Sequence, residues 1–262
     1  MDARTVALAG ATGGAGTTRS CLELATALAA AGDDVAVLDA AYDTQGLARH
    51  LPGRLDPDVT ALVADDADEP LSTGFVEYEA ATGPDTATAI DAEERPEPVR
   101  VACCPARAPF ERLARAKTPE AAQELEARIS EASSSFDYVL VDTPPLGSNP
   151  AVAAVTTADR VGVVAPATEH GHDAVQQTRG RLQDVGTAAD AVVAVEQFDN
   201  GTFPEADADV RLPAFDGAAP SALETEAGVR ALETLADAVL DTELDLPVAE
   251  SGLTERLGSI GN

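Results

Sequence analysis

The chain has 262 residues, 45% of them hydrophobic, so it is long and apolar enough to bury a core and is not a disordered chain. Its 46 acidic and 17 basic residues give a net charge of −29, and Lys117 is the single lysine, a composition expected of a halophilic protein that works in molar salt. This charge argues against direct binding of nucleic acid and against attachment to anionic membranes.

The amino terminus carries no signal-peptide pattern and leads directly into an apolar run. No apolar run approaches the roughly 18 residues that a membrane-spanning helix needs. The three cysteines, Cys21, Cys103 and Cys104, match no disulfide framework and no metal-site spacing. These features predict a cytoplasmic protein with reduced cysteines.

Short apolar runs alternate with helix patterns along most of the chain. Strands are predicted at residues 5–10, 35–38, 99–104, 138–141, 161–165 and 191–195, with a short edge strand at 211–213. Helices are predicted at residues 18–31, 119–133 (capped by Thr118), 173–185 and 222–240. The alternation predicts an α/β fold: a doubly wound, mostly parallel sheet with helices on both faces.

Residues 52–98 interrupt this alternation with a stretch rich in Asp, Glu, Thr, Gly and Pro. We expect an irregular acidic insertion there, with a short helix near residues 59–64 and a strand near residues 75–78. Residues 247–262 form a predicted C-terminal tail, in which Arg256 is the only basic residue. The sequence therefore predicts one domain over residues 1–246, followed by this tail.

Glycines crowd the turn between the first strand and the first helix, where the sequence runs GATGGAGTTRS from Gly10. Such a turn lets backbone N–H groups approach a phosphate, and the helix start attracts negative charge. One interpretation is an NAD(P)-binding protein of the short-chain-dehydrogenase type, in which Gly10, Gly13 and Gly16 form G-x-x-G-x-x-G and Asp39 holds a ribose hydroxyl. That class also needs Tyr-x-x-x-Lys, and the sequence contains no such pair.

The other interpretation is a degenerate P-loop. The segment from Thr12 to Thr18 resembles the deviant Walker A sequence Lys-Gly-Gly-Val-Gly-Lys-Thr of the MinD/ParA family. Asp43-Thr-Gln-Gly46 resembles that family's Asp-Pro-Gln-Gly, and FDYVLVDTPP at residues 136–145 resembles its switch II segment. The likeness spans residues 4–50 and 99–240 in the family's order. The chain is thus similar to the MinD/ParA branch (SIMIBI class, CobQ/CobB/MinD/ParA-like) of P-loop ATPases, which implies a P-loop NTPase-like fold.

The resemblance also implies a cofactor, ATP or ADP with Mg²⁺, and residues that hold it. Thr18 and Asp142 match the family's Mg²⁺ ligands. The aspartate that orients the attacking water corresponds to Asp39 by strand position or to Asp43 by alignment on Gln45. The implied nucleotide-binding residues are consecutive: Gly13, Gly14, Ala15, Gly16, Thr17 and Thr18.

Both lysines of the family's loop are missing. Thr17 replaces the lysine that grips the β- and γ-phosphates, and Thr12 replaces the signature lysine that reaches across a dimer. Losing one electrostatic stabiliser of this kind typically costs about 2.7–4 kcal/mol of transition-state stabilisation. The resemblance also implies that the family's adenine-reading asparagine is replaced near Glu196 and Gln197. We therefore expect weak or absent ATP hydrolysis.

Two functions of different classes follow. The first is a nucleotide-binding switch, at most a slow ATPase, that positions or partitions a cellular component. The second is a pseudo-ATPase that binds no nucleotide and keeps the fold as an interaction module. The resemblance implies a homodimer and a protein partner, although Thr12 removes a lysine on which the family's dimer depends.

Overall fold

A single sheet organises the computed structural model, which describes residues 4–78, 100–196, 203–215 and 217–246. The sheet has eight strands in the order β3-β4-β2-β5-β1-β6-β7-β8, and only the β3–β4 pair is antiparallel. The strands are β1 Arg4–Gly10, β2 Val35–Asp39, β3 Val76–Glu77, β4 Val101–Cys104, β5 Tyr138–Thr143, β6 Arg160–Pro166, β7 Ala191–Val195 and β8 Val210–Leu212. The predicted mostly parallel α/β fold is confirmed.

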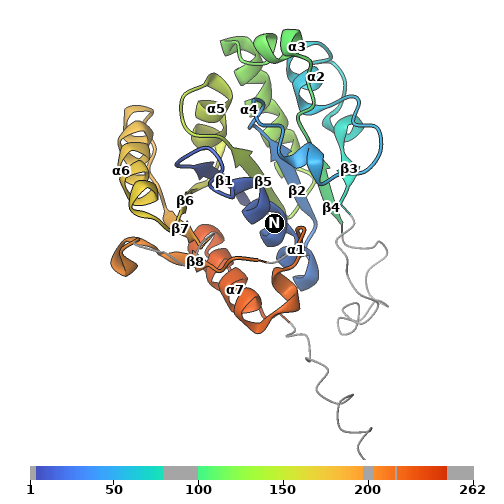
Figure 1. Cartoon of the computed structure of the whole chain (residues 1–262). Helices are drawn as coiled ribbons and strands as arrows, with labels where there is room; N and C mark the ends of the chain where they lie inside the picture. Colours follow the sequence, from blue (N-terminus) through green and yellow to red (C-terminus); the bar gives the residue numbers. More distant parts are fainter. Residues whose placement is uncertain (1–3, 79–99, 197–202, 216, 247–262) are drawn as a thin grey trace, which may run out of the picture.

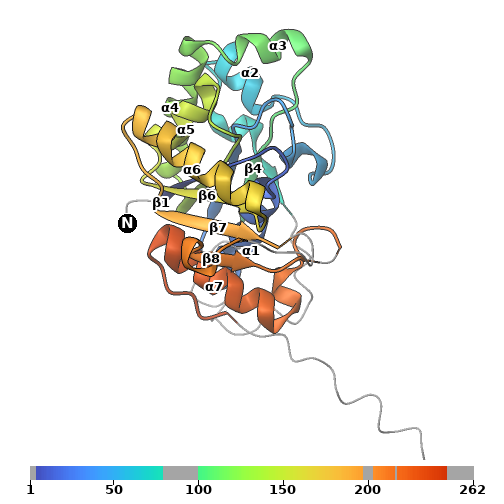
Figure 2. The same cartoon turned by 60° about the vertical axis from the view of Figure 1, so that its left-hand side comes forward.

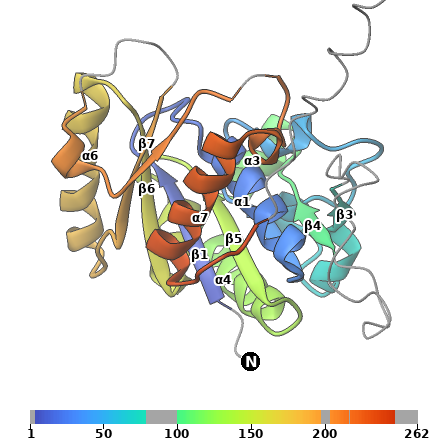
Figure 3. The same cartoon turned by 90° about the horizontal axis from the view of Figure 1, so that it is seen from below.

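Helices cover both faces of the sheet, as Figure 2 shows with the layers seen from the side. The helices are α1 Thr17–Ala31, α2 Val59–Ala64, α3 Phe110–Arg115, α4 Pro119–Ser133, α5 Asn149–Thr157, α6 Glu169–Asp184 and α7 Glu226–Leu240. Helices α1 and α7 pack side by side on one face, and α4, α5 and α6 lie on the other (Figures 1 and 3). No helix of the described residues is long and apolar enough to cross a membrane.

Successive side chains of the central strands point to opposite faces of the sheet and pack in two separate hydrophobic cores. In β1, Val6 and Leu8 pack in the core under α1 and α7, whereas Ala7 and Ala9 pack in the core under α4 and α5. All four side chains are fully buried. Strands buried on both faces read as continuous apolar runs, which is why the sequence pattern located them.

The short helix predicted near residues 59–64, within the insertion, is present as α2. Asp58 caps α2 by accepting from the Ala61 N–H, and Leu62 of this helix is fully buried in the core against α4. The predicted strand near residues 75–78 is present as β3, at the edge of the sheet. Residues 79–98 and the predicted tail, residues 247–262, lie outside the described residues.

Candidate functional site

The candidate site lies where the three central strands end. Strand β5 pairs with β2 on one side and β1 on the other, and all three are parallel, so their carboxyl ends share one edge of the sheet. Asp39 is directly opposite Asp142 in the β2–β5 register. The glycine-rich turn follows β1 at the same edge. Ligands of open α/β sheets bind at this kind of edge.

The glycine-rich turn leads into α1, and no side chain caps the start of that helix. Gly14 (φ 72°) and Gly16 (φ 93°) both adopt left-handed backbone conformations, which glycine accepts without strain. Gly16 makes no side-chain cap, and the first turn of α1 has no acidic residue. By contrast, α4, α6 and α7 each begin at a threonine whose hydroxyl accepts a backbone N–H. The start of α1 therefore retains donors for an anion.

Open space lies over the middle of the turn. A Cβ atom placed on Gly13 or Gly14 would meet no atom within 4 Å. A Cβ on Gly10 would instead lie 3.0 Å from the Thr17 hydroxyl, which therefore folds back toward the end of β1. Thr12, the other replaced lysine position, is half-buried in the turn. The turn is therefore open on the side of Gly13 and Gly14.

Thr18 connects the turn to the end of β5. Its hydroxyl donates to Asp142 Oδ2 over 2.5 Å. The segment from Asp43 to Gly46 (DTQG) packs closely against the same side chain, because a Cβ atom on Gly46 would lie 2.7 Å from Thr18 Oγ1. The sequence similarity at Gly46 thus has a steric basis, and the two predicted Mg²⁺ ligands are in direct contact.

Asp39 and Asp142 form a buried acidic pair. Asp39 is fully buried and accepts from the N–H groups of Ala41 (2.8 Å) and Ala106 (3.2 Å). Burial and the charge of Asp142 raise the pKa of Asp39 well above its usual range. Burial raises the pKa of Asp142 to about 6, while the Thr18 hydroxyl lowers it. Because Asp39 faces inward, it does not present a carboxylate to a ribose, which disfavours the dinucleotide interpretation.

Asp43 lies on the rim of the site and not beside Asp39. Its side chain is 62% exposed and forms an ion pair with Lys117, the single lysine of the chain. The Lys117 carbonyl accepts from Asn149 Nδ2 at the start of α5 (2.8 Å). The two candidates for the water-orienting aspartate therefore occupy different environments, one buried at the strand end and one exposed.

The loop after β8 is tied to α1 by a buried carboxylate that the sequence analysis missed. Glu23 is fully buried and accepts from the N–H groups of Ser221 (3.0 Å) and Ala222 (2.9 Å). Arg19 donates to Glu23 over 3.2 Å and to the Ser221 hydroxyl over 2.7 Å, and its guanidinium lies over the Phe215 ring. A lone glutamate inside the otherwise apolar run CLELATALAAA was the available signal.

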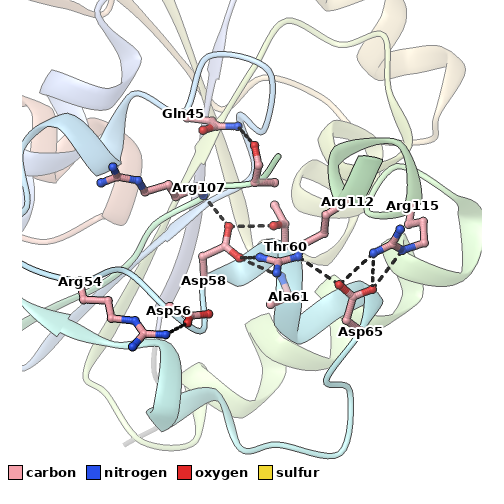
Figure 4. A network of polar contacts seen from close by, with 11 residues as sticks. Gln45, Arg54, Asp56, Asp58, Thr60, Ala61, Asp65, Arg107, Arg112 and Arg115 are labelled. Carbon is pink, nitrogen blue, oxygen red and sulfur yellow. Dashed lines mark hydrogen bonds and ion pairs between the residues drawn. The ribbon is translucent and has the colours of Figure 1, made fainter. Parts of the chain in front are cut away.

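A polar network fixes the segment after β4 at the same edge of the sheet (Figure 4). Asp58 is fully buried and accepts from Thr60 Oγ1 (2.7 Å), the Arg107 N–H (2.5 Å) and Arg112 Nη1 (2.9 Å). Gln45 of the DTQG segment donates to the Ala108 carbonyl over 3.0 Å. These contacts hold residues 106–108 between the DTQG segment and α2.

Comparison with solved structures finds the same fold over most of the chain. The cell division ATPase MinD of Pyrococcus furiosus matches with a TM-score of 0.66 at 16% identity, over 91% of this chain and 98% of that one. Cobyrinic acid a,c-diamide synthase of Mycobacterium smegmatis, solved with an ATP analogue and magnesium, matches at 0.66 and 16%, over 95% and 100%. A chain of the MinC:MinD cell division protein complex of Aquifex aeolicus matches with a TM-score of 0.63 at 16% identity, over 94% of this chain and 98% of that one.

These likenesses establish the architecture. The chain has the fold of the MinD/ParA/CobB group of P-loop ATPases, at low sequence identity. Neither a family model nor a curated protein sequence matches it.

Proposed function

Starting from this fold, we propose that the protein binds an adenine nucleotide with Mg²⁺ at the turn formed by residues 13–18 and hydrolyses it slowly or not at all. The observation that carries the proposal is the junction of the turn with β5. There the uncapped start of α1 lies beside Thr18, whose hydroxyl contacts Asp142 over 2.5 Å. These are the two side chains that would hold the metal ion.

The donor set suits Mg²⁺ bound together with a nucleotide. Mg²⁺ takes oxygen ligands in octahedral geometry and is commonly held by one or two protein side chains, phosphate oxygens and water. Thr18 and Asp142 supply two such oxygens. Among the described residues no group of three or more His, Cys, Asp or Glu side chains could hold a metal alone. Bound Mg²⁺ would neutralise phosphate charge, and the backbone of the turn would hold the phosphate chain.

The charge of the site supports slow turnover. Phosphoryl transfer depends on positioning and on neutralising the charge of the transferred group. Thr12 and Thr17 provide hydroxyl groups where ammonium groups would act, and the buried Asp39 and Asp142 add negative character. The proposed cycle is therefore one of binding and release. We place it in a switch that positions or partitions a cellular component, acting as a homodimer with a protein partner.

Calorimetric titration of the full chain with Mg²⁺ and ATP or ADP in about 3 M KCl tests nucleotide binding. We expect saturable binding by the wild-type protein and a large loss in Thr18→Ala, because that variant removes a metal ligand. Thr234→Ala is the control, since Thr234 is also a helical threonine but is exposed on α7, where its hydroxyl donates only to the Arg230 carbonyl. Phosphate release measured in parallel should stay below about 1 s⁻¹, the low end of typical enzymes.

One observation also favours the second function, an interaction module without nucleotide. Thr18 already satisfies Asp142, and backbone N–H groups satisfy Asp39, so the acidic pair is hydrogen-bonded without a metal ion. The same titration separates the two functions. Absence of heat with either nucleotide in the folded wild-type protein supports the module and contradicts the nucleotide proposal.

A further inference from the structure

Arg107 is the residue from which this inference starts. It follows β4, whose Cys104 is the register partner of Leu38, the residue before Asp39. The ends of β4, β2 and β5 are thus neighbours, and residue 107 lies just beyond the buried acidic pair. The adjacent Ala106 N–H donates directly to Asp39 over 3.2 Å.

The backbone around Arg107 is held on three sides. Asp39 accepts from the N–H of residue 106, Asp58 accepts from that of residue 107 (2.5 Å), and Gln45 donates to the carbonyl of residue 108 (3.0 Å). An arginine on a fixed backbone loses less entropy on binding a ligand than one on a free loop. The surrounding polar network therefore fixes the backbone of Arg107 beside the loop that donates to Asp39.

The guanidinium of Arg107 itself is exposed and has no ion pair or hydrogen bond among the described residues. Asp58, the nearest carboxylate to its backbone, pairs instead with Arg112. Figure 4 shows the Arg107 side chain pointing away from Asp58 and from Arg112. An unpaired guanidinium stands out in a chain with a net charge of −29.

Other basic groups near this edge are engaged. Arg19 contacts Glu23, Gly217 and Ser221, Lys117 pairs with Asp43, and Arg49 donates to the Thr44 carbonyl. A nucleotide triphosphate brought to the acidic pair needs positive charge besides Mg²⁺, and both P-loop lysine positions are threonine. Guanidinium groups bind phosphate through paired hydrogen bonds.

We propose that Arg107 contacts the terminal phosphate of the bound triphosphate and supplies the positive charge that the glycine-rich turn lacks. This inference rests on the proposed nucleotide site. It makes the protein selective for the triphosphate over the diphosphate, because the contact involves only the terminal group. It also gives the segment after β4 a role in distinguishing bound ATP from bound ADP.

The test is calorimetric titration of Mg²⁺–ATP and Mg²⁺–ADP into the full chain in about 3 M KCl, where the Debye length is below about 3 Å and only direct contacts persist. We expect Arg107→Gln to weaken ATP binding about tenfold or more and ADP binding less than about threefold. Arg107→Lys should restore part of the loss. Arg54→Gln, at another exposed arginine that pairs with Asp56, is the control and should change neither affinity.

The outcomes separate this inference from the proposed function. If the wild-type protein binds both nucleotides and Arg107→Gln leaves the ratio of the two affinities unchanged, the role of Arg107 is contradicted and the nucleotide site stands. If the wild-type protein binds neither, both proposals fail. The melting temperature of ligand-free Arg107→Gln should equal that of the wild type, because the exposed guanidinium makes no hydrogen bond or ion pair with the residues that the structure describes.

Discussion

At the scale of single residues, the buried pair of Asp39 and Asp142 determines how the protein responds to pH. Both carboxyl groups are fully or almost fully buried on adjacent strands, and burial raises both pKa values. A raised folded-state pKa favours the protonated form, so this pair stabilises the fold most below about pH 4, the pKa of an unfolded aspartate. That contribution is lost as the pH rises through about 6, the folded-state pKa of Asp142.

Metal binding should show the opposite dependence on pH, because Mg²⁺ binds the ionised carboxylate. We predict that the rise in melting temperature caused by Mg²⁺–ATP grows between about pH 5.5 and pH 8. In Asp39→Asn this growth should begin at about the same pH, because burial raises the pKa of Asp142. Thermal scans across this range in high salt measure it, with the exposed Asp68→Asn as control. A ligand-induced shift that is constant with pH would contradict the assignment of Asp142 as a metal ligand.

Glu23 is the second residue with a large predicted effect. Its buried carboxylate accepts two backbone N–H groups and an Arg19 contact, so Glu23→Ala leaves all of these donors without their acceptor. We predict a loss of about 3 kcal/mol in the free energy of unfolding. Urea unfolding in high salt measures it, and Glu126→Ala on the exposed side of α4 is the matched control. Equal effects of the two substitutions would show that Glu23 does not anchor the loop after β8.

At the scale of elements, the sequence pattern predicted the strands that are buried on both faces and the helices that begin at a clear capping residue. The predicted strand at residues 191–195 and helix at 119–133 have these bounds in the structure, including the Thr118 cap. Helices α3 and α5 were missed. Helix α5 follows a proline-rich turn, is short and has polar residues only at its two ends, so no alternating polar face reveals a helical period.

The predicted helix over residues 222–240 is interrupted for a related reason. The Thr225 hydroxyl accepts from the Gly228 N–H and starts α7 at Glu226, which separates it from a short helical turn at residues 222–224. Threonine favours such caps over helix interiors. At the site, the sequence indicated the glycine-rich turn and Asp142, whereas the contacts of Glu23 and Asp58 join segments far apart in the chain and required the fold.

Contact between the DTQG segment and α1 gives a prediction for two glycines. Gly46→Ala places a Cβ 2.7 Å from Thr18 Oγ1, which the Asp142 hydrogen bond holds in place, so we expect a loss of about 1–3 kcal/mol in stability and weaker nucleotide binding. Gly180→Ala on α6 meets open space and should stabilise by about 0.5–1 kcal/mol. Chemical unfolding of both variants measures the difference. Similar effects of the two would show that Gly46 does not pack on Thr18.

At the scale of the whole molecule, the net charge of −29 predicts that the fold depends on salt. The Debye length falls from about 10 Å at 0.1 M salt to about 3 Å at 1 M, so molar salt removes most of the repulsion between surface carboxylates. We predict that circular dichroism shows loss of helix on dilution from about 3 M to 0.1 M KCl. An unchanged spectrum would show that the apolar cores hold the fold despite the repulsion.

The central claim is that the turn after β1 holds a phosphate chain through its backbone although no lysine remains there. Crystals grown with Mg²⁺ and a non-hydrolysable ATP analogue in molar KCl test it most directly. The account predicts triphosphate density over Gly13 and Gly14, with a metal ion between Thr18 and Asp142. No analogue density at the turn, or an analogue bound at another place on the sheet, would contradict it.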